Sequence, residues 1–202
     1  PEQREMLDAL MMGGSPELLQ KQRPPRPPEG FSPFEPGPKA AVRPTGLYEN
    51  ILRRVAPYGV RGVIWYQGED DDARGWHAFY DESMKALIQS WRRLWKRELT
   101  FLQVELAPLH EGLGKALNYA VIREKQRDVM DALPGVHNVC ILDAGDARNI
   151  HVRKKRPVGE RLALLARKYV YGEMELLADS PRLCSVGRAD STVSLKFLYS
   201  GS

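Results

Sequence analysis

The fold of this chain is decided by the segment Val60-Arg61-Gly62-Val63-Ile64-Trp65-Tyr66-Gln67-Gly68-Glu69-Asp70-Asp71-Asp72. Its first half is apolar, β-branched and aromatic, which predicts a buried strand over 60–66. Its second half begins with Gln67, Gly68 and Glu69 and is polar. Open α/β sheets place their ligand sites just beyond the carboxyl ends of strands. We therefore interpret the polar half either as a plain turn or as one side of a functional site.

Short apolar strands and longer amphipathic helices alternate along the rest of the chain. Strands are expected at 60–66, 99–106 and 136–142, and helices at about 45–56, 76–96, 116–133 and 157–171. This alternation predicts the α/β class, with a mostly parallel sheet and helices on both faces. The tryptophans of the 76–96 segment are expected in the core. A last, half-exposed strand is predicted over 193–199.

Three segments are expected along the chain. Residues 1–44 form a short helix and a proline-rich crossing segment, 45–180 the α/β domain, and 181–202 the terminal strand. The proline-rich part is interpreted as a linker or surface crossing, and the alternative is a ligand for a proline-binding module. Three strong strands are few for a self-sufficient parallel sheet.

Composition narrows the classes of function without choosing one. Hydrophobic residues make up 43% of the 202 and charged residues 28%, so a packed core is possible. The net charge of +4 leaves nucleic-acid binding as a weak alternative, but the one dense basic cluster, 153–156, is read as a solvated helix start. Cys140 and Cys184 have no metal-ligand spacing. The sequence contains neither a membrane-length apolar run nor a signal peptide, and it begins at Pro1, which suggests an upstream N-terminus.

Two polar loops follow predicted strand ends and should meet at one edge of a parallel sheet. They are 67–72 and 143–151. The Gln67 amide would donate to an oxyanion, His151 would be a general base, and Asp146 or Asp143 would orient the imidazole. A nucleophile is missing from this set. The alternative for His151 is an ordinary surface loop histidine.

Two further groups of residues have alternative interpretations. Arg123 and Gln126 share a helix face, and Arg123 is expected to pair with Glu69 and hold the Gln-Gly-Glu turn, unless this helix is simply exposed. Asp70, Asp71 and Asp72 are consecutive and cannot easily face one ion, so a solvated turn is favoured over a metal site.

Several motifs together resemble the sialate O-acetylesterase family, the carbohydrate-esterase branch of the SGNH (GDSL-like) hydrolases. They are Arg43-Pro44-Thr45-Gly46-Leu47-Tyr48, Val63-Ile64-Trp65-Tyr66-Gln67-Gly68-Glu69, Tyr80, Leu87-Ile88-Gln89-Ser90-Trp91-Arg92, Arg123-Glu124-Lys125-Gln126, Asp143-Ala144-Gly145-Asp146, Ile150-His151 and Val158-Gly159-Glu160-Arg161-Leu162-Ala163-Leu164. The resemblance implies a three-layer, flavodoxin-like α/β/α fold. It also implies hydrolysis of sugar O-acetyl esters by a serine, without metal or other cofactor.

By this resemblance His151 is the base and Gln67 an oxyanion or substrate donor. Gly68, Glu69 and Arg123 are assigned to the substrate side of the site. The family's Gly-Gln-Ser-Asn nucleophile motif and its Trp-Gly-Gly-Thr segment are absent from the sequence, and Asn149-Ile150-His151-Val152 replaces the common Asp-Ile-His-Pro. Glu69-Asp70-Asp71 likewise replaces the family's Glu-Ser-Asn.

The sequence therefore favours an acetylesterase whose fold is incomplete at the N-terminus. Its nucleophile would come from a missing N-terminal segment or a partner chain, and its substrate would be an acetylated carbohydrate. Binding of nucleic acid or membrane is not expected, and the family suggests an extracytoplasmic or secreted location. The alternative is a catalytically inactive carbohydrate-binding or interaction module on the same scaffold.

Overall fold

The computed structural model describes residues 45–56, 58–109, 118–146 and 149–199. It divides the chain into two compact units, Pro1–Val55 and Ala56–Ser202. The expected helix and proline-rich stretch of 1–44 lie outside the described residues. No helix among the described residues is both long enough and apolar enough to cross a membrane.

In the first unit, the described residues form one short helical stretch, η1 (Tyr48–Leu52), a π-helix, followed by α3 (Arg53–Val55). Thr45 lies in a turn with φ 63°, and its carbonyl accepts a hydrogen bond from the Glu49 amide at 2.9 Å. The same glutamate pairs with Arg53 at 2.6 Å, one helical turn later.

The second unit is built on a parallel sheet of order β1-β2-β3. Its strands are β1 (Gly62–Trp65), β2 (Thr100–Val104) and β3 (Val136–Val139). The predicted strands are confirmed in place and order, but each is shorter than its apolar run. Ile64 pairs with Leu102, and Leu102 pairs with His137, so all three carboxyl ends lie at the same edge.

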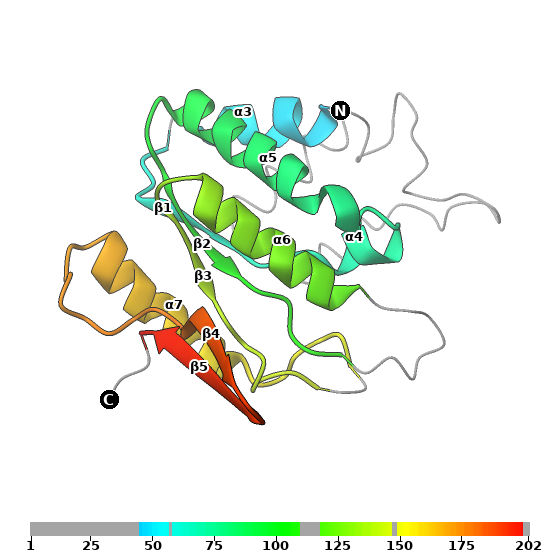
Figure 1. The fold of residues 1–202 in the computed structure, drawn as a ribbon. Coiled ribbons are helices and arrows are strands. Elements are labelled where there is room, and N and C mark those ends of the chain that lie inside the picture. The colour runs from blue at the N-terminus through cyan, green and yellow to red at the C-terminus, as the bar shows by residue number, and fades with distance from the viewer. Residues whose placement is uncertain (1–44, 57, 110–117, 147–148, 200–202) are drawn as a thin grey trace. The chain divides into compact units, whose positions relative to one another are not determined.

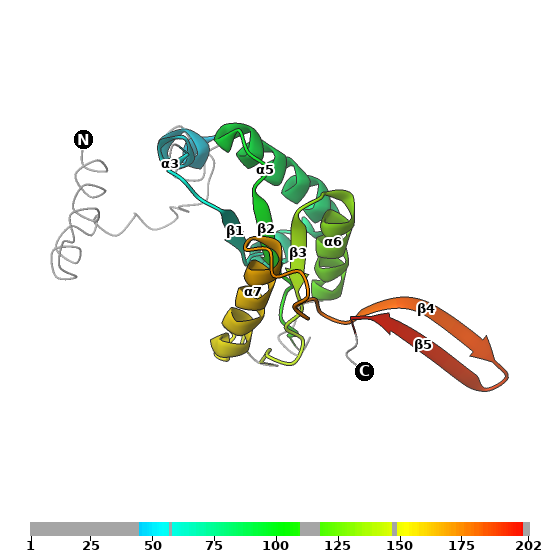
Figure 2. The ribbon, with the colours of Figure 1, turned by 90° about the vertical axis from the view of Figure 1, so that its left-hand side faces the viewer.

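Helices cover both faces of this sheet, as the sequence predicted (Figures 1 and 2). The connection from β1 to β2 contains α4 (Glu69–Ala73), η2 (His77–Phe79) and α5 (Tyr80–Trp95). The connection from β2 to β3 contains α6 (Tyr119–Ala132), which lies beside α5. The last helix, α7 (Lys155–Tyr169), covers the opposite face. Residues 110–117, part of the expected loop and helix start before α6, lie outside the described residues.

Two hydrophobic clusters fill the layers on either side of the sheet. The buried residues on the α5 and α6 side are Tyr80, Met84, Ile88, Leu99, Phe101, Leu106, Tyr119, Ile122, Val129 and Val136. Those on the α7 side are Leu102, Val104, Ala107, Val139, Ile141, Ala144, Val152, Val158 and Leu165. In each cluster, apolar residues at helical spacing pack against every second residue of the strands.

One part of the predicted core is exposed. Trp65, Trp91 and Trp95 pack against the α5-side core, and the Trp65 and Trp91 rings meet edge to face at 6.1 Å. Trp76 was expected on the same stripe but is 54% exposed. It precedes the 3-10 turn η2, where the helical phase of α5 has not yet begun, and Arg74 lies over its ring at 5.2 Å.

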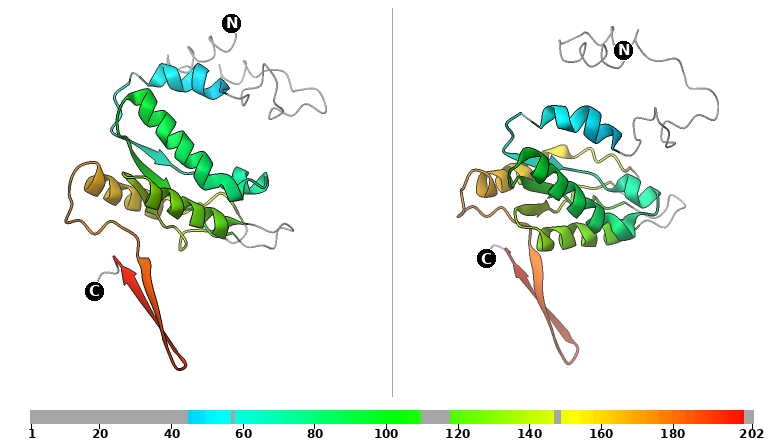
Figure 3. Two further views of the ribbon diagram at one scale, coloured as in Figure 1. Left: turned by 45° about the horizontal axis from the view of Figure 1, so that its top comes forward. Right: turned by 90° about the horizontal axis from the view of Figure 1, so that it is seen from above.

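The predicted terminal strand belongs to a separate hairpin and not to the main sheet. It forms β5 (Thr192–Leu198), which pairs antiparallel with β4 (Arg182–Ala189), a strand that the sequence analysis missed. All residues of both strands are exposed, and the hairpin extends away from the sheet (Figure 3). The alternation of apolar residues in β5 was correct, but its apolar face is exposed rather than half-buried.

Candidate functional site

The turn after β1 holds Gly68 in a conformation that suits glycine alone. Its φ is 154°, and a Cβ there would lie 3.2 Å from side-chain carbons of Ile122 and Leu106. The backbone therefore approaches the core more closely than any side chain would allow. The Tyr80 hydroxyl donates to the Gln67 carbonyl at 3.1 Å, which fixes the turn from the side of α5.

The side chain of Gln67 faces the α5 side of the sheet. Its amide donates to the Asp71 carboxylate, one turn along in α4. With Trp65, Asp71 and Tyr80 it lines a cavity of about 350 Å³. An amide has two N–H groups, so the hydrogen bond to Asp71 leaves one for another acceptor.

The three aspartates after this turn form a short helix and not the solvated turn that we expected. Asp70 pairs with Arg74 at 2.6 Å, and Asp71 accepts from Gln67. Asp72 is buried and accepts the Asn118 amide at 2.9 Å, just before the first turn of α6. The three carboxylates therefore bind three different groups. Among the described residues no cluster of His, Cys, Asp and Glu could hold a metal ion.

Gln126 and Tyr80 connect the turn to the end of β2, a role that the sequence analysis missed. Gln126 is fully buried, accepts the Leu106 amide at 3.0 Å and donates to the Val104 carbonyl at 3.1 Å. It also lies 3.5 Å from the Tyr80 hydroxyl. Burial raises the pKa of Tyr80 to about 12, so the phenol stays a donor. The signal was present, since Gln126 closes the Arg-Glu-Lys-Gln motif of an amphipathic helix.

Arg123 does not make the expected ion pair with Glu69 in the described structure. Its guanidinium donates instead to the Leu106 carbonyl at 3.4 Å. Burial lowers the pKa of Arg123 from its ordinary value, and Glu105 opposes that shift. The prediction was wrong about the partner because Arg123 faces the end of β2, whereas Glu69 lies in the first turn of α4.

The loop after β3 is tied to α7 through Asp143. Both oxygens of this carboxylate accept from Arg161 at 2.6 Å, and the same guanidinium donates to the Cys140 carbonyl at 2.8 Å. The bond to Arg161 lowers the pKa of Asp143 to about 2. With both oxygens bound to Arg161, Asp143 is poorly placed to orient a histidine, and of the two acids Asp146 alone retains that predicted role.

His151 is exposed in the loop that leads to α7. Its backbone amide donates to the Asn149 side chain at 2.8 Å, and the Asn149 amide donates to the Asp146 carbonyl at 3.4 Å. These two hydrogen bonds both join residues of the loop itself. Residues 147–148 of this loop lie outside the described residues.

One contact connects the residues that flank the two loops. The Lys155 ammonium at the start of α7 lies 4.6 Å from the centre of the Tyr66 ring, directly before Gln67. The Gly145 backbone also closes on the loop after β2, since a Cβ there would lie 2.4 Å from Pro108. The structure thus brings the loops after all three strands to one edge, while the side-chain hydrogen bond of Gln67 and the backbone hydrogen bond of His151 each join residues close in sequence.

Comparison with known proteins agrees with this arrangement. The sequence profile described as "carbohydrate esterase, sialic acid-specific acetylesterase" matches residues 34–168. The solved structure of XAC1771, a carbohydrate acetylesterase from Xanthomonas citri, is similar with a TM-score of 0.72 and 36% sequence identity. The match covers 82% of this chain and 39% of that one. No curated protein sequence matches. The family profile spans most of the α/β domain, and the chain therefore belongs to the sialic acid-specific acetylesterase family of carbohydrate esterases.

Proposed function

We propose that this chain provides the base and one oxyanion donor of a carbohydrate O-acetylesterase. The observation that carries the proposal is the contact between Tyr66 and Lys155 at 4.6 Å, because it brings the residue before Gln67 next to the start of α7, four residues after His151. In parallel sheets this edge is where ligands bind. Family membership supports acetyl esters of sugars as the substrate class.

In the proposed reaction a serine hydroxyl attacks the acetyl carbonyl carbon, and the imidazole of His151 takes its proton. The negative charge on the carbonyl oxygen is held by N–H donors, among them the second N–H of Gln67. The sugar oxygen then leaves with the proton from His151. Water, deprotonated by the same imidazole, releases acetate from the serine. Asp146 is proposed to favour the protonated imidazole, and Gly68, Glu69 and Arg123 to shape the substrate side.

The nucleophile is proposed to come from polypeptide beyond these 202 residues, as no Gly-Gln-Ser-Asn motif occurs within them. The free edge of β1 supports this proposal. Within the described residues β1 pairs with β2 alone, and Ile64, on the α7 side of β1, is 63% exposed. A further strand beside β1, with a helix over Ile64, would bury that surface and add its own loop to the carboxyl edge.

The test is a reconstitution assay. The chain is combined with a segment that carries Gly-Gln-Ser-Asn, and acetate release from an acetylated sugar is measured with and without a serine-directed inhibitor. We expect inhibitor-sensitive turnover from the combination only. His151→Ala should abolish it, and Gln67→Ala should lower it about 10²- to 10³-fold, as for other oxyanion donors. Gln89→Ala, the same change at an exposed position farther along α5, is the control.

Two results would contradict the proposal. Strong, inhibitor-sensitive turnover by the chain alone would show that its nucleophile lies within the 202 residues. Glycan binding without turnover after reconstitution would favour the inactive binding module, which Asn149 in place of the family's aspartate also favours.

A further inference from the structure

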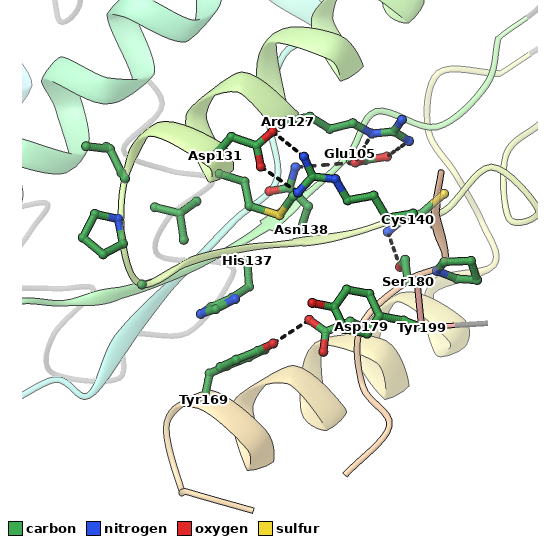
Figure 4. A pocket seen from close by; sticks show the side chains of 17 residues that line it. Glu105, Arg127, Asp131, His137, Asn138, Cys140, Tyr169, Asp179, Ser180 and Tyr199 are labelled. Carbon is green, nitrogen blue, oxygen red and sulfur yellow. Dashed lines mark hydrogen bonds and ion pairs between the residues drawn. The ribbon is translucent and has the colours of Figure 1, made fainter. Parts of the chain in front are cut away.

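Another pocket lies along the edge of β3 that pairs with no other strand among the described residues (Figure 4). It has a volume of about 310 Å³ and lies between α6, α7 and the residues that lead into β4. It contains neither Gln67 nor His151. The size is at the lower end of the range for small-ligand sites, which suits one or two rings.

The charged groups of this pocket neutralise one another. Three carboxylates each have a cationic partner at hydrogen-bond distance: Glu105 with Arg127, Asp131 with Arg182, and Asp179 with Lys168. The net charge is therefore close to zero, although each carboxylate can still accept more than one hydrogen bond. Such a pocket gives no electrostatic advantage to an anion or a cation. It favours an uncharged ligand with many hydroxyl groups.

Aromatic rings form part of its wall. Tyr169 stacks on His137 with 3.4 Å between ring centres and donates to Asp179 at 2.7 Å. Tyr199 lines the same pocket and is 47% exposed. In Figure 4 both tyrosines lie on the side of the pocket opposite α6. Sugar rings pack their C–H faces on aromatic side chains while their hydroxyls bind planar polar groups, so the combination suits a saccharide.

The backbone groups at the edge of β3 favour a saccharide over a peptide as the ligand. In the parallel ladder the backbone groups of Val136, Asn138 and Cys140 point away from β2. Those of Cys140 are already bound, its amide to Ser180 at 3.2 Å and its carbonyl to Arg161 at 2.8 Å. Two residues are too few for an added strand, but their N–H and C=O groups can bind sugar hydroxyls.

We propose that the pocket along β3 binds a neutral saccharide unit, at a site separate from the proposed esterase site. Its position would let the protein hold one part of a glycan while another part is at the carboxyl edge of the sheet. Binding at β3 needs no nucleophile, so this proposal and the proposed function can fail independently.

The test uses the full 202-residue chain labelled with ¹⁵N. Xylotetraose, tetra-N-acetylchitotetraose and galactose are the neutral probes, N-acetylneuraminic acid is the charged one, and a Val-Thr pentapeptide is the strand probe. At up to about 20 mM, millimolar affinity is detectable. We expect a neutral probe to shift the amide signals of 136–140 and Tyr199. Tyr199→Ala should weaken binding about three- to tenfold, whereas Tyr171→Ala, an exposed tyrosine outside the pocket, should not.

Each other outcome overturns the proposal. Absence of shifts at 136–140 with all three neutral probes would show that the pocket binds no saccharide of this class. Stronger binding of N-acetylneuraminic acid there would show that the pocket selects an anion. Shifts with the pentapeptide alone would assign the edge to strand addition. An equal effect of Tyr199→Ala and Tyr171→Ala would place binding elsewhere.

Discussion

Gly68 is the residue of the site that is least tolerant of substitution. Its φ of 154° is unfavourable for a side chain, and Ile122 and Leu106 leave no room for one. We expect Gly68→Ala to lower the free energy of unfolding by about 1–3 kcal/mol. Gly159→Ala is the matched control, since no atom lies within 4 Å of its Cβ position in α7, and it should stabilise by about 0.5–1 kcal/mol. Urea unfolding measures both, and equal effects would contradict this account of the turn.

Gln126 is the buried residue on which the end of β2 depends. Gln126→Leu would leave the Leu106 amide and the Val104 carbonyl without their partners. Each unpaired buried group costs about 1–3 kcal/mol, so we expect a loss of about 2–5 kcal/mol in urea unfolding. Glu124→Gln, an exposed change on the same helix, should stay within about 0.5 kcal/mol. A loss below 1 kcal/mol would mean that water replaces the amide.

The sequence could identify the type of these residues but not their partners. Gln67 was correctly placed just past a strand end, yet period-two alternation puts its side chain with Trp65 on the α5 side, bound to Asp71. Arg123 was assigned to Glu69 from spacing alone. Which carbonyl a guanidinium reaches depends on how two elements pack, and spacing within one helix does not contain that information.

At the scale of elements, α7 is attached to the loop after β3 by the Asp143–Arg161 pair. The pKa of Asp143 is about 2 in the folded chain against an ordinary 3.8, so its stabilising effect is present above about pH 4 and is lost as the pH falls towards 2. We expect Asp143→Asn to be less stable than the wild type at pH 6 and to differ less from it at pH 2. Denaturant titrations at both pH values test this.

The control for the pH series is Asp190→Asn, the same chemical change in the turn of the hairpin. It should leave the pH dependence of unfolding as in the wild type. A constant difference between Asp143→Asn and the wild type across pH 2–6 would show that the ion pair does not contribute to acid sensitivity.

The β4–β5 hairpin carries an apolar face made by Leu183, Val186, Val193, Leu195 and Phe197, all exposed. Replacing Val186 and Leu195 by threonine, a β-branched residue that suits strands, should change the unfolding free energy by less than about 0.5 kcal/mol per site. It should also reduce concentration-dependent association in sedimentation experiments. A loss of several kcal/mol would mean that this face packs against the body of the protein.

The hydrophobic periodicity of the chain predicted the order of the elements. It did not predict where each element ends or which sheet each strand joins. Strands 99–106 and 136–142 were each predicted too long, because buried apolar residues continue past the last ladder pair, as Leu106 and Ile141 do. The alternation in β5 was detected, whereas β4 contains Cys184 at an irregular register and no regular alternation. Pairing between strands is a long-range property that local patterns do not specify.

For the whole molecule, the esterase site requires that the loops of Gln67 and His151 share the carboxyl edge of the sheet. The parallel register and the Tyr66–Lys155 contact support this, and the family match agrees with it. The family resemblance was recognisable in the sequence because its motifs keep their order over most of the chain. The hydrogen-bond partners of Gln67 and Asp143 required the structure.

The most direct test is a paramagnetic relaxation measurement on the chain itself. A nitroxide is attached at Asn149→Cys, two residues before His151, with Cys140 and Cys184 replaced by alanine and serine. The account predicts strong broadening of the side-chain amide signals of Gln67 and little broadening of those of Gln89, farther along α5. Unbroadened Gln67 signals, or equal broadening of both glutamines, would contradict a shared edge and with it the esterase site.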